Sequence, residues 1–195
     1  MAKTGLQPGV LLAMPASSDL TLSRAVLLLI RHGDQGSFGL VLNHPSIMKT
    51  SELFDSLRLS WRGEDVVFRG GPVSAEKGWV LHEPIAGTVS ITSQIGMSTT
   101  IEQLRAIATT PPARFKMVLG SIDWAPGQLA RALPRGVARA DADPALVFET
   151  APELLWDRVQ AIGVEPADPH GIGARIRRLF GLAPAIPRAT MRRPR

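Results

Sequence analysis

The sequence of 195 residues contains neither cysteine nor tyrosine, and its longest apolar run is the six residues Ala25–Ile30. Without cysteine, disulfide scaffolds, cysteine-ligated zinc and thiol nucleophiles are excluded. A run of six is far too short to span a bilayer, which takes about 20 apolar residues. Asp19 and Arg24 also interrupt the stretch in which a signal peptide needs its apolar segment, so we expect a cytoplasmic protein.

Complete catalytic motifs are missing as well. The segment Gly96–Thr100 fails the serine-nucleophile pattern G-x-S-x-G at its last position. Neither glycine-rich phosphate loop, G-x-x-x-x-G-K-S/T or G-x-G-x-x-G, occurs. Aromatic residues make up only 5% of the chain, and no aromatic ladder or helix-turn-helix spacing supports sequence-specific recognition of nucleic acid. We therefore expect a protein without enzymatic activity and without a cofactor.

The net charge of +5 comes from the carboxyl terminus. No acidic residue lies between Ile172 and Arg195, and residues 1–171 alone carry a net charge of −2. Prolines and glycines punctuate this segment, so we expect residues 166–195 to form a flexible tail that folding does not need. Its arginines leave two readings open: simple solvation, or weak, nonspecific contact with nucleic acid or an anionic surface. The candidate anion-binding residues are Arg175, Arg177, Arg178, Arg192, Arg193 and Arg195.

Short apolar runs bounded by glycine, proline and aspartate dominate the first half of the chain and are typical of strands. The loop Gly33–Gly36 is short enough to join two of them as an antiparallel hairpin. The predicted strands are Val10–Met14, Ala25–Ile30, Phe38–Leu42, Val66–Phe68, Trp79–Leu81, Val89–Thr92, Phe115–Ser121 and Ala145–Phe148.

Three helices interrupt the strands. Ser51–Leu59 places Leu53, Phe54 and Leu57 inward, and Pro152–Ile162 carries the apolar stripe Leu154, Leu155, Val159 and Ile162 before Gly163. Thr99 and Glu102 have the spacing of a capping box, followed by an apolar face of Ile101, Leu104 and Ile107. Consecutive strands with inserted helices predict a single α+β domain over residues 1–165.

Five blocks of the sequence, in this order and spacing, resemble the AlgH/YqgE family of bacterial proteins. They are Leu12–Pro15, Gly39–Pro45, Gly70–Val73 with Gly78–His82, Leu119–Gly120 with Trp124–Leu129, and Phe148–Trp156. The resemblance extends from Gly9 to Gly163 and departs from the family at His44, where arginine is common, and at Ile122-Asp123, where small residues are common.

This resemblance implies a strongly curved, mostly antiparallel and barrel-like sheet with helices packed outside. It also implies a cytoplasmic protein of unestablished molecular activity, acting by binding a protein or a small molecule. One name-giving relative is associated with regulation of alginate production, and some members are labelled transcriptional regulators. A regulatory role is therefore the expectation, with no agreed catalytic residues to carry over.

Three histidines, His32, His44 and His82, offer an alternative, because zinc commonly takes three neutral imidazoles plus water. They could hold a metal for hydrolysis if the fold brought them together. The other reading is that they are turn histidines with backbone hydrogen bonds.

Loop residues supply a candidate groove for a ligand or partner. Gly70-Gly71 beside Arg69 predicts either a tight turn or a nest of backbone N–H groups for an anion. Trp124 could line a groove or cover the core, and Asn43 could cap a turn or touch a ligand. The full set of candidate groove residues is Asn43, His44, Gly70, Gly71, His82, Trp124 and Gln128.

Overall fold

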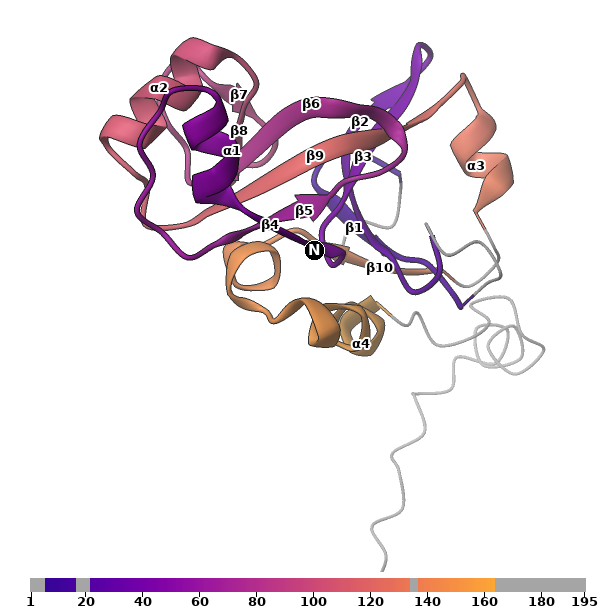
Figure 1. Ribbon diagram of the computed structural model, residues 1–195. Coiled ribbons are helices and arrows are strands. Elements are labelled where there is room, and N and C mark those ends of the chain that lie inside the picture. The colour runs from indigo at the N-terminus through magenta and orange to yellow at the C-terminus, as the bar shows by residue number, and fades with distance from the viewer. Residues whose placement is uncertain (1–5, 17–21, 134–136, 164–195) are drawn as a thin grey trace, which may run out of the picture. The chain divides into compact units, whose positions relative to one another are not determined.

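The computed structural model describes residues 6–16, 22–133 and 137–163, which belong to one compact unit, Met1–Val164. This part of the chain forms a curled, mostly antiparallel half-barrel sheet with helices outside, the α+β class that the sequence predicts (Figure 1). Its strands are β1 (Val10–Ala13), β2 (Val26–Gly33), β3 (Gly36–Val41), β4 (Pro45–Lys49), β5 (Val66–Arg69), β6 (Val73–His82), β7 (Val89–Ser90), β8 (Gly96–Ser98), β9 (Phe115–Trp124) and β10 (Ala138–Asp141).

The sheet runs in the order β10-β1-β2-β3-β9-β6-β8-β7, with β4 paired to β5 and β5 paired to β9. Strand β9 joins the two halves of the sheet. Residues 115–121 of β9 pair with β6, residues 122–124 with β3, and residues 118–119 with β5, which is the parallel pair. Because β5 enters where β3 leaves β9, the sheet turns at this point.

Helices cover opposite faces of this sheet, as Figure 1 shows with α4 below and α1 and α2 above. The helical elements are α1 (Thr50–Ser56), α2 (Ile101–Thr109), α3 (Gln128–Ala132), a π-helical turn η1 (Ala145–Glu149) and α4 (Pro152–Gly163). Leu155 and Val159 of α4 pack with β1, β2 and β3 in the largest core cluster. Leu104 and Ile107 of α2 pack with Phe54 of α1 and with β5, β6 and β9 on the other face.

Several local predictions are confirmed. Gly33 and Gly36 face each other across the β2–β3 hairpin, which needs the positive φ of +101° that Gly36 adopts. Helix α4 begins at Pro152 and ends at Gly163, and both Leu155 and Val159 are fully buried. None of the described helices is long and apolar enough to cross a membrane.

The predicted strand Ala145–Phe148 is wrong, because these residues form the π-helical turn η1. The Asp143 carboxylate accepts a hydrogen bond from the Leu146 N–H at 3.0 Å, and Pro144 already has helical φ and ψ. The Asp143 side-chain cap and the proline after it therefore start a helical turn, although the apolar run taken alone is typical of a strand.

Other predictions need correction at the level of single residues. The capping box of α2 lies one residue later than expected, with Thr100 Oγ1 accepting from Gln103 N and Gln103 Oε1 accepting from Thr100 N. Four residues of the predicted apolar faces are at least 39% exposed, since each lies at the edge of its helix or beyond its end: Leu57, Ile101, Leu154 and Ile162. Strands β4, β8 and β10 are not among those predicted.

Candidate functional site

The predicted groove residues do not all lie in one place in this fold. Two of them, His82 and Trp124, lie at opposite ends of strand β9. His82 pairs with Phe115 at the first residue of β9, whereas Trp124 is the last. At about 3.3 Å per residue, the two ends of this ten-residue strand lie roughly 30 Å apart along the chain. One groove therefore cannot contain both His82 and Trp124.

The three histidines are dispersed in the same way. His32 Nδ1 contacts Ser37 Oγ at 2.7 Å, and Ser37 pairs with Trp124 at the far end of β9 from His82. His44 lies between these ends, with its carbonyl accepting from the Arg69 N–H. Among the described residues no group of three His, Asp or Glu side chains could hold a metal ion. The fold thus does not bring the three histidines together, and His82 is the one whose ring contacts a backbone carbonyl, that of Glu83.

The surroundings of His44 favour the neutral form of its imidazole, which is also the form that ligates metals. Burial, and next to it the positive charge of Arg69, lower the pKa of its imidazole below the ordinary 6.5. The ring is therefore neutral at pH 7.

The remaining groove residues have structural roles. Asn43 Oδ1 accepts from Val26 N at 2.7 Å and its Nδ2 donates to Arg24 O at 2.9 Å, so its amide ties two distant segments together. Gln128 Oε1 accepts from Ala125 N at 2.8 Å at the start of α3. Trp124 packs against the cluster around Ile122 and so covers the core.

The two glycines mark a close backbone approach, not an open nest. Gly70 N donates to Leu119 O at 2.7 Å, and Gly70 O accepts from Val41 N at 2.9 Å. A Cβ at Gly70 would collide with the Gly120 carbonyl, and one at Gly71 with the Ser121 carbonyl. Glycine is required here because the chain just after β5 passes close to the backbone of β9 and bonds to both Val41 of β3 and Leu119 of β9.

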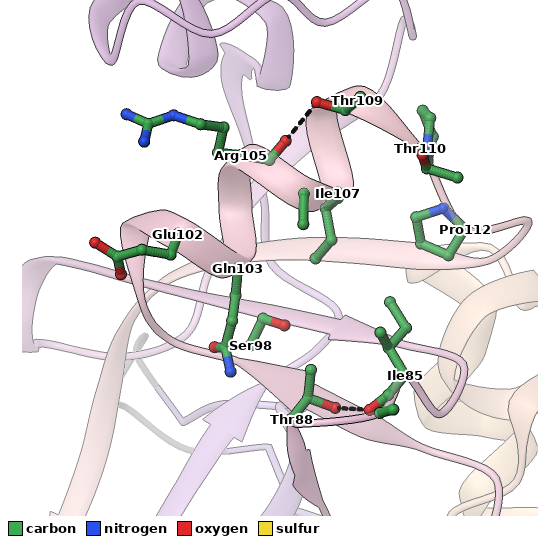
Figure 2. A pocket seen from close by; sticks show the side chains of 13 residues that line it. Ile85, Thr88, Ser98, Glu102, Gln103, Arg105, Ile107, Thr109, Thr110 and Pro112 are labelled. Carbon is green, nitrogen blue, oxygen red and sulfur yellow. Dashed lines mark hydrogen bonds between the residues drawn. The ribbon is translucent and has the colours of Figure 1, made fainter.

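A cavity of about 760 Å³ lies elsewhere, between α2 and the loops that flank β7 and β8 (Figure 2). We call it the α2 pocket. Helix α2 forms its roof, the turn at residues 85–88 and Ser98 of β8 form its floor, and Pro111 and Pro112 close one end. The lining residues are Ile85, Ala86, Thr88, Ser98, Glu102, Gln103, Arg105, Ala106, Ile107, Thr109, Thr110, Pro111 and Pro112.

Hydrogen bonds of the lining side chains keep the α2 pocket apolar. Thr88 Oγ1 donates to Ile85 O at 2.7 Å, and Thr109 Oγ1 donates to Arg105 O at 2.9 Å, so both hydroxyls are engaged with backbone carbonyls (Figure 2). Gln103 Nε2 donates to Gly87 O at 3.0 Å and ties the helix to the turn. In Figure 2 the charged ends of Glu102 and Arg105 point away from the cavity. A ligand would therefore meet mainly methyl, methylene and proline surface.

The floor of the α2 pocket holds a buried serine–histidine pair. His82 Nδ1 lies 2.5 Å from Glu83 O, so Nδ1 carries the proton and donates to that carbonyl. His82 Nε2 must then accept from Ser98 Oγ at 2.8 Å. This is the polarity of a serine nucleophile beside its base, but both side chains are fully buried.

Oxyanion donors beside Ser98 are also occupied. The N–H groups of Thr99 and Thr100 both donate to Gln103 Oε1, at 2.9 and 3.3 Å. A tetrahedral intermediate on Ser98 would need such donors free and pointing at the new oxyanion. The pair therefore joins β6 to β8 and leaves the lone pairs of Ser98 Oγ as acceptors beneath the pocket.

Sequence reasoning missed the α2 pocket because its lining is chemically plain. Alanine, threonine and proline carry no catalytic signature, and Pro111-Pro112 is typical of a segment that ends a helix. Ala106 and Thr109 are exposed positions of α2, where small side chains are ordinary, so they give no signal of a pocket in the sequence.

Comparison with known proteins places these observations in a family. Residues 10–167 match the family described as AlgH-like. The chain is 39% identical over 158 residues to a UPF0301 protein of Burkholderia vietnamiensis, covering 75% of this chain and 82% of that protein. A UPF0301 protein of Variovorax paradoxus is 36% identical over 166 residues, covering 76% and 83%.

Two solved structures share the fold. The solution structure of the AlgH protein from Pseudomonas aeruginosa superposes with a TM-score of 0.64 at 28% identity, covering 91% of this chain and 94% of that one. The crystal structure of a Corynebacterium diphtheriae protein superposes with a TM-score of 0.66 at 20% identity, covering 82% and 88%. The second likeness concerns the fold alone.

Proposed function

The chain belongs to the AlgH-like family, and we propose that it is a non-catalytic, cytoplasmic binding protein that holds a small apolar molecule in the α2 pocket and acts in regulation. The observation that carries this proposal is the α2 pocket itself, with its volume of about 760 Å³. Ligand sites in proteins are clefts of roughly 300–1,000 Å³ lined mostly by apolar side chains with few polar groups.

The chemistry of the lining favours a neutral ligand. Glu102 and Arg105 carry opposite charges and lie three residues apart on α2, so this part of the helix offers no net charge to an ion. The Glu102 carboxylate is engaged first by its own backbone N–H and then by the Thr100 hydroxyl, which lowers its pKa.

Two features support binding without turnover. Ser98 is fully buried beneath the pocket, and the neighbouring N–H groups already donate to Gln103 Oε1. A bound molecule would thus contact the floor without meeting a reachable nucleophile or a free oxyanion site.

The regulatory part of the proposal rests on the family label and on where the α2 pocket lies. Its roof is a surface helix whose outer face a protein partner could contact, and its floor turn is joined to that helix by the Gln103–Gly87 hydrogen bond. A ligand that packs against both would favour one arrangement of helix and turn over others.

Fluorescence titration with N-phenyl-1-naphthylamine, a neutral apolar dye, tests the proposal. Ala106 is an exposed α2 residue that lines the pocket, so Ala106→Phe fills the cavity without disturbing the core. Ala161→Phe places the same side chain on the exposed face of α4 and is the matched control. We expect saturable dye binding by the wild type and by Ala161→Phe, and at least tenfold weaker binding by Ala106→Phe. Equal binding by all three would contradict the proposal.

A further inference from the structure

A second cavity, of about 490 Å³, opens between β2, β3, β6 and β9 and shares no residue with the α2 pocket. We call it the half-barrel mouth. It combines an apolar wall with charged residues, whereas the α2 pocket keeps its charges outside. The residues that matter here are Arg31, Phe38, Lys77, Trp79, Ser121 and Asp123.

Strand register places three of these side chains in one row. Arg31 pairs with Phe38 across β2 and β3, and Phe38 pairs with Asp123 across β3 and β9. Directly paired residues point to the same face of a sheet, so Arg31 and Asp123 flank the Phe38 ring. Gly120 has a positive φ of +76°, so the side chains of β9 after it are out of step with the alternation before it. Ser121 and Asp123 therefore lie on the same inner face as Val118.

An irregularity in β6 brings in the fourth residue. Val73 pairs with Ser121 and Gly78 with Leu119, so four residues of β6 lie opposite one residue of β9. This segment leaves the ladder and carries Ser74 and Lys77 to the cavity. Ser74 has a positive φ of +48°, a strained conformation for a serine and of the kind that gathers at ligand sites.

The apolar wall contains an unsatisfied donor. The rings of Phe38 and Trp79 meet edge to face at 4.9 Å between centroids. The indole N–H groups of Trp61 and Trp156 donate to Asp65 Oδ2 and Met14 O, but the buried Trp79 Nε1 has no hydrogen-bond acceptor. Buried polar groups are nearly always paired, so Trp79 needs an acceptor that the described residues do not supply.

The charged residues of the mouth lack ion-pair partners too. Within the described part of the chain, no acidic group lies within 4.0 Å of the Arg31 or Lys77 nitrogens, and no base within that distance of the Asp123 carboxylate. Two cations face one anion, so the cavity favours a negative charge.

We propose that the half-barrel mouth binds a small organic monoanion with an apolar body, a carboxylate whose oxygens accept from Trp79 Nε1, Arg31 and Lys77 and whose apolar part lies on Phe38. The site is independent of the α2 pocket, and either can exist without the other.

Calorimetric titration with octanoate tests this site in the Ala106→Phe protein, where the α2 pocket is filled and cannot compete. We expect octanoate to bind at least tenfold more tightly than 1-octanol or octylamine. Arg31→Gln together with Lys77→Gln should weaken octanoate binding at least tenfold. Asp123→Asn should strengthen it, because a repelling charge is removed. Equal affinity for octylamine, or weaker binding of octanoate by Asp123→Asn, would overturn the assignment of an anion.

The indole resonances in a ¹H–¹⁵N spectrum give a second readout. The chain has four tryptophans, and Trp79→Phe identifies the Trp79 signal by its loss. Octanoate should move that signal downfield, as a new acceptor does, while the Trp61 and Trp156 signals stay in place. Movement of the other signals with the Trp79 signal unchanged would place octanoate elsewhere and contradict the proposal.

Discussion

Helices α4 and α2 lie on opposite faces of one sheet, and a cavity opens at α2. Helix α4 buries Leu155 and Val159 completely, and Trp156 Nε1 donates to Met14 O at 2.5 Å. The Arg24 guanidinium lies 4.1 Å from the Trp156 ring and 3.3 Å from Asp157, which fastens the outer edge of α4. Helix α2 also buries two side chains, Leu104 and Ile107, but its exposed Ala106 and Thr109 lie beside the cavity. The two helices therefore differ in what lies at their edges: indole and guanidinium contacts fasten α4, whereas small side chains of α2 leave a cavity open.

The largest expected effect is on the α4 side. Leu155→Ala should lower the free energy of unfolding by about 2–5 kcal/mol, because it leaves a cavity in a closed core. Leu154→Ala, at a side chain that is 50% exposed, is the control on the same helix and should cost less than about 1 kcal/mol. Urea melts of both variants measure the free energy of unfolding. Equal losses of stability would mean that Leu155 is not buried in a closed core beneath α4.

The α4 side of the sheet is not purely apolar, because it contains the buried side chain of Lys116. This side chain is 5% exposed, its Nζ donates to Leu42 O at 3.2 Å and lies 4.3 Å from the Phe68 ring, and burial lowers its pKa to about 8. The unfolded chain binds a proton here up to its ordinary pKa of 10.5, so stability rises with pH between about 8 and 10.5.

Urea melts at pH 7 and pH 10.5 compare the wild type with Lys116→Met. The wild type should gain up to about 3 kcal/mol relative to the variant over this range, following 1.36 kcal/mol per pKa unit. A difference between the two proteins that stays constant with pH would show that Lys116 is not buried as a cation.

The capping box of α2 gives a smaller effect with a sharp control. Thr100→Ala removes the side chain that accepts from Gln103 N and should cost about 1 kcal/mol. Thr99→Ala, one residue earlier, should cost a few tenths of a kcal/mol, since the substitution keeps the backbone N–H of residue 99 that donates to Gln103 Oε1. Thermal melts distinguish the two variants. A larger loss of stability for Thr99→Ala than for Thr100→Ala would favour the Thr99–Glu102 capping box that the sequence predicts.

The smallest effect on stability is expected for the arginine-rich tail, which lies outside the described residues. Truncation after Gly171 should leave the melting temperature nearly unchanged while the net charge moves from +5 to −2. Binding to heparin or duplex DNA, measured against salt, should fall steeply with salt in the full chain and vanish in the truncated one. Equal binding by both would place the anion-binding surface in the folded domain.

Local chemistry explains which parts of this fold the sequence predicts. The Gly33–Gly36 hairpin and α4 follow from residues close together in the chain, namely a glycine turn, a starting proline and a regular apolar stripe. The π-helical turn at Ala145–Glu149 does not, because a carboxylate at Asp143 decides between helix and strand for an ambiguous apolar run. Strands β8 and β10 are short, and they are strands because they pair with β6 and β1, which lie far away in the sequence.

The sites were less predictable than the fold. Histidines, glycines and Trp124 attract attention in a sequence, but here they satisfy backbone groups, permit close strand packing or cover the core. Both cavities depend on long-range register: the α2 pocket on how α2 crosses the 85–88 turn, and the half-barrel mouth on the Arg31–Phe38–Asp123 row. Pairing between strands far apart in the chain cannot be obtained from residue spacing alone.

Native mass spectrometry of the full-length protein, purified without detergent, tests most directly whether the α2 pocket holds a small apolar molecule. The account predicts a noncovalent adduct in the wild type and in Ala161→Phe that is released on gentle activation as a neutral compound, and its loss in Ala106→Phe. An adduct retained equally by Ala106→Phe, or no adduct together with no binding of the neutral dye, would contradict it.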